Sequence, residues 1–548
     1  MATIANKSEI KSEEVAGGDN AASLSSGERT WRPKHNPWLI GSAVSLAAFM
    51  EVLDTSIANV ALPYMAGSLG ASNDESTWVL TSYLVSNAIV LPISGWLANV
   101  IGRKRFFMMC IFLFTASSLF CGVAPSLPIL LLARIAQGAG GGGLQPMAQA
   151  ILADTFSPEQ RGLAFALYGI TAVTAPTVGP TLGGWITDNY SWRWIFFINL
   201  PVGLLALGLV FRLVEQPPHL IRKTSGTRLD YVGIALLTLG IGALQILLDK
   251  GQEEDWFGSH FITVLAVIAA VCLITLVFWE WFHKEPIIDM RLFSNFNFLG
   301  ANLMMFAFGV MLFSSLVMMP LFLQTLTGYT AELAGLAISA GGLVILAEMP
   351  IVGQLTQRIQ VRYIIAAGWL ALLIGMTYSA YNLNLLLSFS FATWMRIVQV
   401  LGIGLLFVPI TLAAYIGMPQ EKSGSVAGMV NFMRNIGASV GTSMVATLIA
   451  RRAQFHQVHL VSKLASDNLL FEERIRTLTV HLSASGLGNY QAQQQAYARL
   501  YGATQQQAQT LAYVDTFWTL AVIAAVMFVV SFVLKKNDPR GGGEVAVG

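Results

Sequence analysis

Residues 133–146 read ARIAQGAGGGGLQP and place an arginine and a run of glycines inside a long apolar segment. Gly138, Gly140 and Gly143 satisfy the G-x-G-x-x-G spacing of a dinucleotide-binding turn, but that turn must follow a strand and open a helix of a βαβ unit. Here the run is continuous and apolar, and no acidic residue follows about 20 positions later, since Asp154 is too near. Small residues let membrane helices approach closely, so the glycines predict helix packing.

The composition places the chain in a membrane. Of 548 residues, 55% are hydrophobic and 11% are charged, whereas soluble domains carry about 25% charged residues. The net charge of +2 is too small to indicate a nucleic-acid partner. Cys110, Cys121 and Cys272 all lie in apolar runs without the spacing of a disulfide framework or a metal site. No G-x-x-x-x-G-K-[ST] phosphate loop is present, so ATP-driven transport would need a separate subunit.

Fourteen apolar runs are long enough to cross a bilayer, which requires roughly 20 residues for about 30 Å of hydrocarbon. Basic residues gather on one side of these runs, as in Arg103–Arg105 and Lys535–Lys536, so the positive-inside rule predicts that both termini are cytoplasmic. The predicted spans are 38–63, 77–98, 105–124, 127–153, 162–186, 193–213, 230–249, 260–282, 298–326, 332–356, 363–384, 387–416, 425–450 and 513–534.

An internal repeat divides the spans into two similar halves. The pattern R-I-x-Q-x-x-G-x-G at 134–142 returns at 396–404, and G-x-L-x-x-x-I at 95–101 returns at 353–359. Two bundles of six helices with two extra spans between them fit this repeat, and major-facilitator transporters are built from such parallel repeats. The predicted segments are a disordered cytoplasmic tail (1–36), an N-terminal six-helix bundle (37–213), a linker with two transmembrane helices (214–297), a C-terminal six-helix bundle (298–535) with a periplasmic loop (451–512), and a cytoplasmic tail (536–548).

Six charged residues lie well inside the predicted spans, where charges are costly and mark functional sites. They are Glu51, Asp54, Arg134, Glu348, Arg396 and Arg434. Glu51 and Asp54 are three residues apart and share a helix face. Burial and a neighbouring carboxylate both favour the protonated form, so these acids and Glu348 can bind and release protons, and Arg134 can select the charged state. The alternative is a static ion pair that orients helices.

Four stretches in order resemble the fourteen-span drug:proton antiporters, the EmrB/QacA group of the major facilitator superfamily. Residues 53–63 (LDTSIANVALP) resemble the first-span signature, and 95–104 (GWLANVIGRK) resemble the loop between spans two and three. Residues 175–184 (APTVGPTLGG) are similar to the fifth-span antiporter motif, and 192–199 (WRWIFFIN) to the start of span six. The resemblance implies that Arg134 takes part in proton coupling.

Two of these motifs imply conformational roles. The antiporter motif, with Pro176, Gly179, Pro180, Gly183 and Gly184, implies a kinked helix that seals the two halves on the outer side. The loop implies a cytoplasmic latch, and simple positive-inside anchoring is the alternative; its residues are Gly95, Asn99, Gly102, Arg103 and Lys104. Asn99 stands where this loop usually has an aspartate, so a neutral contact replaces a charge-assisted one.

The candidate substrate residues are aromatic, flexible or polar side chains of the spans, which accommodate varied apolar ligands. They are Gln137, Met305, Phe306, Phe313, Asn431, Phe432, Arg434 and Asn435. The alternative for each is packing between helices or contact with lipid.

The long outer loop reads as two polar helices, 453–476 and 489–510. In similar pumps of Gram-negative bacteria, a periplasmic adaptor and an outer-membrane channel complete a tripartite exporter, so adaptor docking is the interpretation and a solvated cap the alternative. The resemblance therefore implies an inner-membrane antiporter, not an enzyme, that exports hydrophobic drugs on the proton gradient without a cofactor. Export of an endogenous metabolite, siderophore or lipid is the alternative, and a receptor or assembly subunit would not need intramembrane charges.

Overall fold

The computed structural model describes residues 33–216, 230–283, 286–462, 464 and 468–536. Within these ranges the chain is helical and contains no β-strand. The predicted N-terminal tail lies almost wholly outside the described residues, as does the C-terminal tail. The helices are α2 (Pro37–Leu69), α3 (Asn73–Ile101), α4 (Arg103–Val123), α5 (Leu127–Thr155), α6 (Arg161–Asn189), α7 (Trp194–Phe197), α8 (Asn199–Leu213), α9 (Tyr231–Lys250), α10 (His260–Phe282), α11 (Phe296–Thr325), α12 (Ala331–Leu355), α13 (Val361–Asn382), α14 (Phe389–Tyr415), α15 (Ser423–Val461), α16 (Leu469–Ala484) and α17 (Asn489–Ser531).

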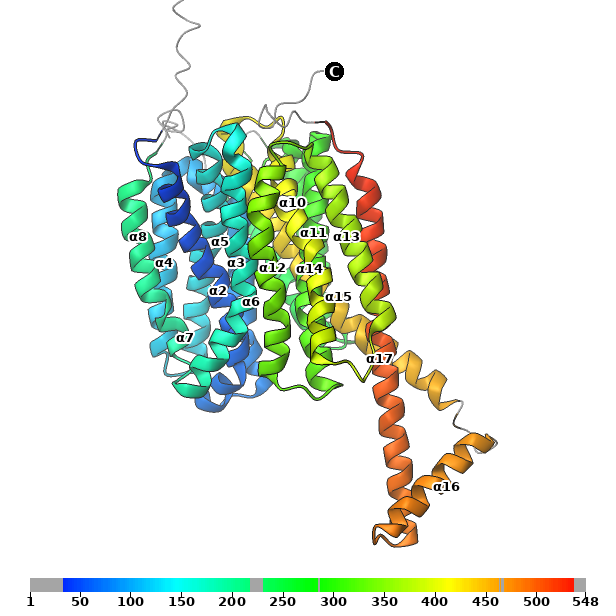
Figure 1. Ribbon diagram of the computed structural model, residues 1–548. Coiled ribbons are helices and arrows are strands. Elements are labelled where there is room, and N and C mark those ends of the chain that lie inside the picture. The colour runs from blue at the N-terminus through cyan, green and yellow to red at the C-terminus, as the bar shows by residue number, and fades with distance from the viewer. Residues whose placement is uncertain (1–32, 217–229, 284–285, 463, 465–467, 537–548) are drawn as a thin grey trace, which may run out of the picture.

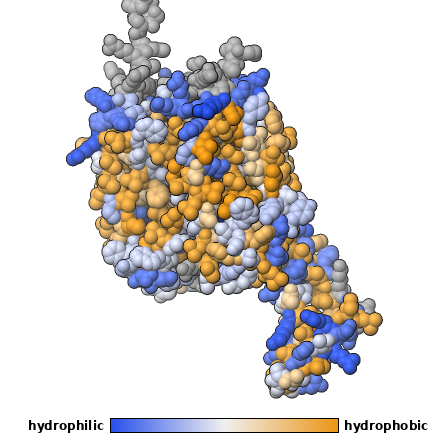
Figure 2. Space-filling view, in the orientation of Figure 1, coloured by the Kyte–Doolittle hydropathy of each residue, from blue (hydrophilic) through white to orange (hydrophobic). Residues whose placement is uncertain are grey.

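Thirteen helical segments of the described chain are long and apolar enough to cross a membrane, which confirms the predicted membrane fold class. They correspond to every predicted run except 425–450. That run lies in α15, which is part of the bundle but carries polar residues such as Asn431, Arg434 and Asn435. Figure 2 shows apolar residues around the bundle, polar residues at its ends, and a mixture of polar and apolar residues on a projecting arm.

The two repeated halves meet at equivalent glycines. A Cβ atom on Gly95 of α3 would lie 2.5 Å from the backbone nitrogen of Ser425 in α15. A Cβ atom on Gly353 of α12, the repeat of Gly95, would lie 3.2 Å from the carbonyl oxygen of Gly162 in α6. Each glycine therefore permits backbone contact between one half and the other, as small residues do at membrane helix interfaces.

The ends of the bundle differ. Both described ends of the chain lie on one side, which we call the terminal side (Figure 1). From the opposite side, the arm side, the outer parts of α15 and α17 project together with α16 (Figure 1). Shared sidedness of the two ends agrees with the predicted topology, and their location in the cytoplasm stays a prediction.

The arm, residues 453–510, corrects one predicted element. A single helix over 453–476 is wrong, because α15 ends at Val461 and α16 begins at Leu469. Residues 489–510 are helical, as predicted, but they are the first part of α17, which continues without a break into the last span. A small apolar core holds α16 against α17, and its buried members are Ile475, Leu482, Ala492 and Ala496. At the base of the arm, Arg452 and His456 of α15 contact Asp515 of α17 at 2.6 and 2.7 Å.

Candidate functional site

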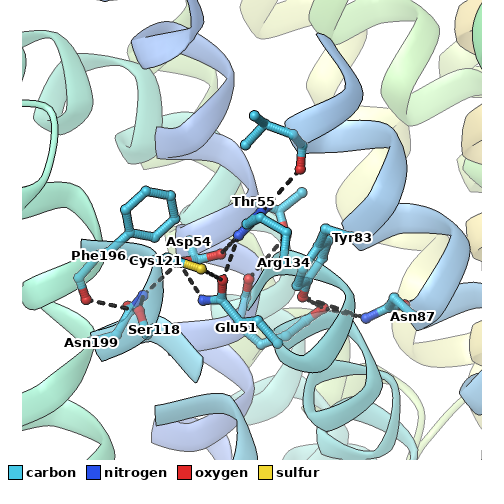
Figure 3. A network of polar contacts seen from close by, with 12 residues as sticks. Glu51, Asp54, Thr55, Tyr83, Asn87, Ser118, Cys121, Arg134, Phe196 and Asn199 are labelled. Carbon is cyan, nitrogen blue, oxygen red and sulfur yellow. Dashed lines mark hydrogen bonds and ion pairs between the residues drawn. The ribbon is translucent and has the colours of Figure 1, made fainter. Parts of the chain in front are cut away.

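Asp54 lies in a buried polar cluster inside the N-terminal half. Its Oδ2 accepts a hydrogen bond from Arg134 Nη1 at 2.7 Å, and its Oδ1 accepts from Gln137 Nε2 at 3.0 Å (Figure 3). The Asn199 amide donates to the same Oδ1 at 2.5 Å. Arg134 is 0% exposed and stacks over the Tyr83 ring, 4.3 Å from its centroid. In this buried cluster, where an unpaired charge is costly, Asp54 and Arg134 neutralise each other.

Glu51 lies one turn before Asp54 on α2 but points into different surroundings. Its carboxylate accepts hydrogen bonds from the Tyr83 hydroxyl at 2.9 Å and from the Asn87 amide at 3.1 Å (Figure 3). Gln145 Nε2 donates to the other carboxylate oxygen at 2.5 Å. No basic group forms an ion pair with Glu51 within the described chain. The two acids therefore share a helix but belong to two networks, and of the two only Asp54 is paired directly with an arginine in the described chain.

A cavity of about 1030 Å³ lies between the two halves. Glu51, Gln145, Phe407 and Arg434 line it deep in the bundle, and residues at the arm-side ends of α2, α6 and α11 line its mouth. Those mouth residues are Tyr64, Asp188 and Gln324. The cavity thus reaches Glu51 from the arm side, while Asp54 and Arg134 are not among its lining residues.

A hydrogen-bonded chain connects Glu51 to the opposite half. Gln145 of α5 donates to Glu51, and its Oε1 accepts a hydrogen bond from Arg434 of α15. Tyr168 of α6 also donates to Gln145 Oε1, at 3.1 Å. The Arg434 guanidinium lies 5.8 Å from the centroid of Phe407 on α14. A change in the charge of Glu51 therefore acts, through Gln145, on the contact of Gln145 with Arg434 in the other half.

Some of the predicted substrate residues line the cavity and others do not. Phe313, Arg434 and Asn435 line it. The remaining five do not: Gln137, Met305, Phe306, Asn431 and Phe432. Gln137 belongs to the Asp54 cluster, and Asn431 donates to Gln149 Oε1 at 2.8 Å on the buried contact between α15 and α5.

Neutral polar residues complete the site, and the sequence analysis missed them. Tyr83, Asn87, Gln145 and Asn199 hold the two carboxylates, as described above. The signal was present, because each is a polar residue in an apolar run and such residues are expensive in a membrane.

The second half repeats the arginine without its acid. Arg396 is 2% exposed and donates to Ser315 Oγ at 3.0 Å and to Gln399 Oε1 at 3.3 Å. Glu348 of α12 is half-buried and packs against Gly404 of α14, and its Oε2 has no hydrogen-bond partner among the described residues. Neither Arg396 nor Glu348 lines the cavity. The structure therefore places Glu348 apart from Glu51 and Asp54.

Arg103 connects the halves on the terminal side. It forms an ion pair with Asp154 at the end of α5, and it donates to Ser423 Oγ at the start of α15 at 3.1 Å. Ser423 Oγ in turn donates to Asp154 Oδ1 at 3.0 Å. Lys104 instead donates to the carbonyl oxygen of Phe211 on α8, within its own half. Only part of the predicted latch thus bridges the two halves in this conformation.

The other latch residues have different surroundings. Gly102 has a φ of +95° between α3 and α4, a conformation that favours glycine. The Asn99 side chain forms no hydrogen bond within the described part of the chain.

The glycines of the antiporter motif pack within one half, whereas Thr177 of the motif faces α12 of the other half, where a Cβ atom on Gly342 would lie 2.7 Å from Thr177 Cγ2. Gly179 and Gly183 of α6 face Ser56 and Ile57 of α2, so the close approach is between helices of the N-terminal half. Ser56 Oγ donates to the carbonyl oxygen of Pro176 at 3.1 Å, the carbonyl that Pro180 leaves without its helical donor. Pro176, Pro180 and Gly184 line the cavity. In this conformation, in which the cavity is open on the arm side, the motif glycines contact α2 of their own half, and the outer seal that the resemblance implies stays a prediction.

We expect Gly95→Ala to weaken closure of the terminal side, because the added Cβ must displace backbone atoms of α15. Overpacking of this kind costs about 1–3 kcal/mol. With the drug export that the resemblance implies as the readout, drug tolerance of cells expressing the variant should fall clearly below that of the wild type at equal expression. Gly67→Ala is the matched control, since nothing lies within 4 Å of a Cβ there. Equal tolerance for both variants would contradict this role of Gly95.

Known proteins are similar to this chain over most of its length. The family model of the Major Facilitator Superfamily matches residues 44–442. The chain is 40% identical over 432 residues to the Multidrug export protein EmrB of Haemophilus influenzae, covering 78% of this chain and 84% of that protein. It is 35% identical over 501 residues to EmrB of Escherichia coli K12, covering 91% and 96%. It is 35% identical over 502 residues to the Fatty acid resistance protein FarB of Neisseria gonorrhoeae, also covering 91% and 96%.

Solved structures share the fold. The human organic anion transporter MFSD10 matches with a TM-score of 0.54 and 14% identity, over 90% of this chain and 100% of that one. The proton:xylose symporter XylE matches with a TM-score of 0.55 and 14% identity, over 89% and 94%. At this identity the similarity concerns the arrangement of helices alone.

Proposed function

The chain belongs to the EmrB-like drug-efflux group of the major facilitator superfamily, and from this premise we propose that it exports hydrophobic and amphipathic drugs in exchange for protons. It is a multi-pass protein of the bacterial inner membrane. The observation that carries the proposal is the position of Glu51, a carboxylate that forms no ion pair with any described residue and lines a cavity open to the arm side. We take the arm side as periplasmic, following the positive-inside rule.

Protons and drugs would meet at the deep end of this cavity. A proton entering from the arm side reaches Glu51, and its binding removes the charge that the Gln145 amide contacts. Gln145 also accepts from Arg434, so protonation alters a contact between the halves. Loss of such a differential contact is what shifts a transporter between conformations. A drug that displaces Arg434 or competes for Glu51 would couple its own release to proton uptake.

Asp54 and Arg134 would act as the second stage of coupling. Their pair is buried behind the cavity, so a proton can reach Asp54 only after local rearrangement around Tyr83, which contacts both Glu51 and Arg134. Arginine keeps its charge when buried, which makes the pair sensitive to the state of Asp54 alone. The gradient of protons, without any cofactor, then drives export.

The test is drug transport in proteoliposomes under an imposed pH gradient. We expect the wild-type protein to accumulate a fluorescent drug when the gradient is present and to lose it when a protonophore is added. Glu51→Gln should lose most gradient-driven accumulation while drug binding is retained, because glutamine keeps the size of the side chain and can still accept from Tyr83 and Asn87 through its carbonyl oxygen, but its amide nitrogen cannot accept from Gln145 and cannot exchange a proton. Gradient-driven transport by Glu51→Gln at the wild-type rate would refute the role of Glu51.

We also propose that the arm docks a periplasmic adaptor of a tripartite exporter that ends in an outer-membrane channel. The arm projects well beyond the bundle (Figure 1) and exposes large apolar side chains. Leu469 is 84% exposed, Leu470 76% and Tyr490 75%. Exposed apolar groups on a projecting element suit a protein partner.

Export of an endogenous lipid-like compound is the second candidate. The name of FarB concerns fatty acids, and the cavity wall includes Phe308, Leu312, Leu316 and Val317 of α11. Such a wall suits acyl chains as well as aromatic drugs. Competition of fatty acids with drug transport in the proteoliposome assay distinguishes the two.

A further inference from the structure

Of the two extra helices between the halves, α9 and α10, the first lines the cavity. Gln245 and Asp249, both on α9, are among its lining residues. The same cavity is lined by Tyr83 and Asn87 of α3 and by Ser439 of α15. On the arm side, α9 therefore supplies part of the wall alongside α3 and α15.

The seam between α3 and α15 changes along its length. Toward the terminal side the two helices touch through backbone atoms at Gly95 and Ser425, and again at Leu91 and Gly428. Toward the arm side the cavity lies between them, and α9 forms hydrogen bonds with both α3 and α15. The helices thus diverge toward the arm side, and α9 closes the gap that their divergence leaves.

The contacts between α9 and α3 include charged groups. Asp249 accepts a hydrogen bond from the Thr81 hydroxyl. Lys250 donates to the Thr77 hydroxyl and also pairs with Glu253 at 2.5 Å. Two turns back along α9, a Cβ on Gly242 would lie 3.7 Å from Val85 Cγ1 of α3, an ordinary van der Waals contact.

The hydrogen bonds that α9 and the turn after it form with α15 are neutral, and they are fewer than those between α9 and α3. Gln245 Nε2 donates to Ser439 Oγ at 2.8 Å, and Ser439 Oγ lies 3.2 Å from Gln245 Oε1. In the turn after α9, Trp256 Nε1 donates to Thr447 Oγ1 at 3.1 Å. Neutral hydrogen bonds are weaker than charge-assisted ones, so α9 is held more firmly to α3 than to α15.

We infer that α9 is a moving wall of the substrate cavity, which travels with α3 and slides past α15 when the cavity closes on the arm side. The inference rests on the proposed function, because alternating access requires the halves to rotate about the site. A helix bonded to both halves must release one of them in that motion. The weaker contact, between Gln245 and Ser439, is the one that breaks. In the open state this wall separates the cavity from the surrounding lipid.

Cross-linking tests the inference in a background whose three native cysteines are replaced and whose drug transport is retained. Gln245→Cys with Ser439→Cys joins α9 to α15, and Val85→Cys with Gly242→Cys joins α9 to α3 as the matched control. Both pairs receive the same short bis-thiosulfonate linker, and each is compared with itself before linkage and after reduction. We expect the first linkage to abolish proton-driven drug transport reversibly and the second to leave it unchanged.

Three other outcomes overturn the inference. Transport that survives linkage of α9 to α15 means that α9 does not slide past α15. Loss of transport on linkage of α9 to α3 alone means that it travels with the other half. Loss with both linkages means that it must move against each. Transport before linkage shows in the same preparation that the exporter works, so failure of the inference is separable from failure of the proposed function.

Discussion

Asp54→Asn is expected to abolish drug-driven proton release in reconstituted vesicles while the protein remains folded. Asparagine has nearly the shape of aspartate and can still accept a hydrogen bond from Gln137, but it leaves Arg134 without its counter-charge. An arginine left unpaired in a buried site costs about 3–5 kcal/mol. The conformation that buries this pair should therefore be disfavoured, and no proton can be exchanged at the position.

Stability and transport must be separated in this experiment. Thermal unfolding of the purified variant reports the first, and proton release on drug addition reports the second. Glu472→Gln, a matched removal of an exposed carboxylate on α16, should change neither quantity. Proton release by Asp54→Asn equal to that of the wild type would reject a role in coupling. Arg134→Lys distinguishes further, because lysine can shed its proton when buried whereas arginine cannot; full activity of that variant would favour plain helix packing.

The membrane fold could be predicted from the sequence because its main determinants are visible along the chain itself. Apolar run length identifies a span, and the repeat around Arg134 and Arg396 identifies the two halves. The same repeat predicted that Gly95 and Gly353 are equivalent, and the structure places both at contacts between the halves. Of the fourteen predicted spans, only the one in α15 is not among the described helices that are apolar enough to cross a membrane. It carries polar residues that lie inside the bundle.

The site could be predicted only in part, because side-chain direction depends on helix packing. Asp54 and Arg134 were expected to interact, and their ion pair follows from opposite charges buried in neighbouring helices. Spacing alone could not show that Glu51, one turn away, faces the cavity. Nor could it show that Gln145 links Glu51 to Arg434 in the other half, a contact between residues 289 positions apart in the chain. Such contacts arise from the packing of whole helices.

Deletion of the arm should separate transport across the inner membrane from resistance in cells. The arm has its own small core around Ile475 and Leu482 and carries none of the cavity-lining residues. Removing residues 458–508 and joining the ends with a flexible linker retains Arg452, His456 and Asp515 at the base. The bundle should therefore fold, and proton-driven drug uptake by inverted vesicles should stay near the wild-type rate.

Intact cells should respond differently to the same deletion. A drug released at the arm side without an adaptor enters the periplasm, from which a hydrophobic molecule can return across the inner membrane. Tolerance should fall toward that of cells lacking the exporter, and an adaptor that co-purifies with the full-length protein should be lost. A milder matched pair sharpens the result: Leu469→Ser with Leu470→Ser removes the most exposed apolar groups of the arm, whereas Gln491→Ser with Gln495→Ser changes only polar ones. If cells expressing the deletion at normal levels keep full tolerance, the arm is a solvated cap and no adaptor docks there.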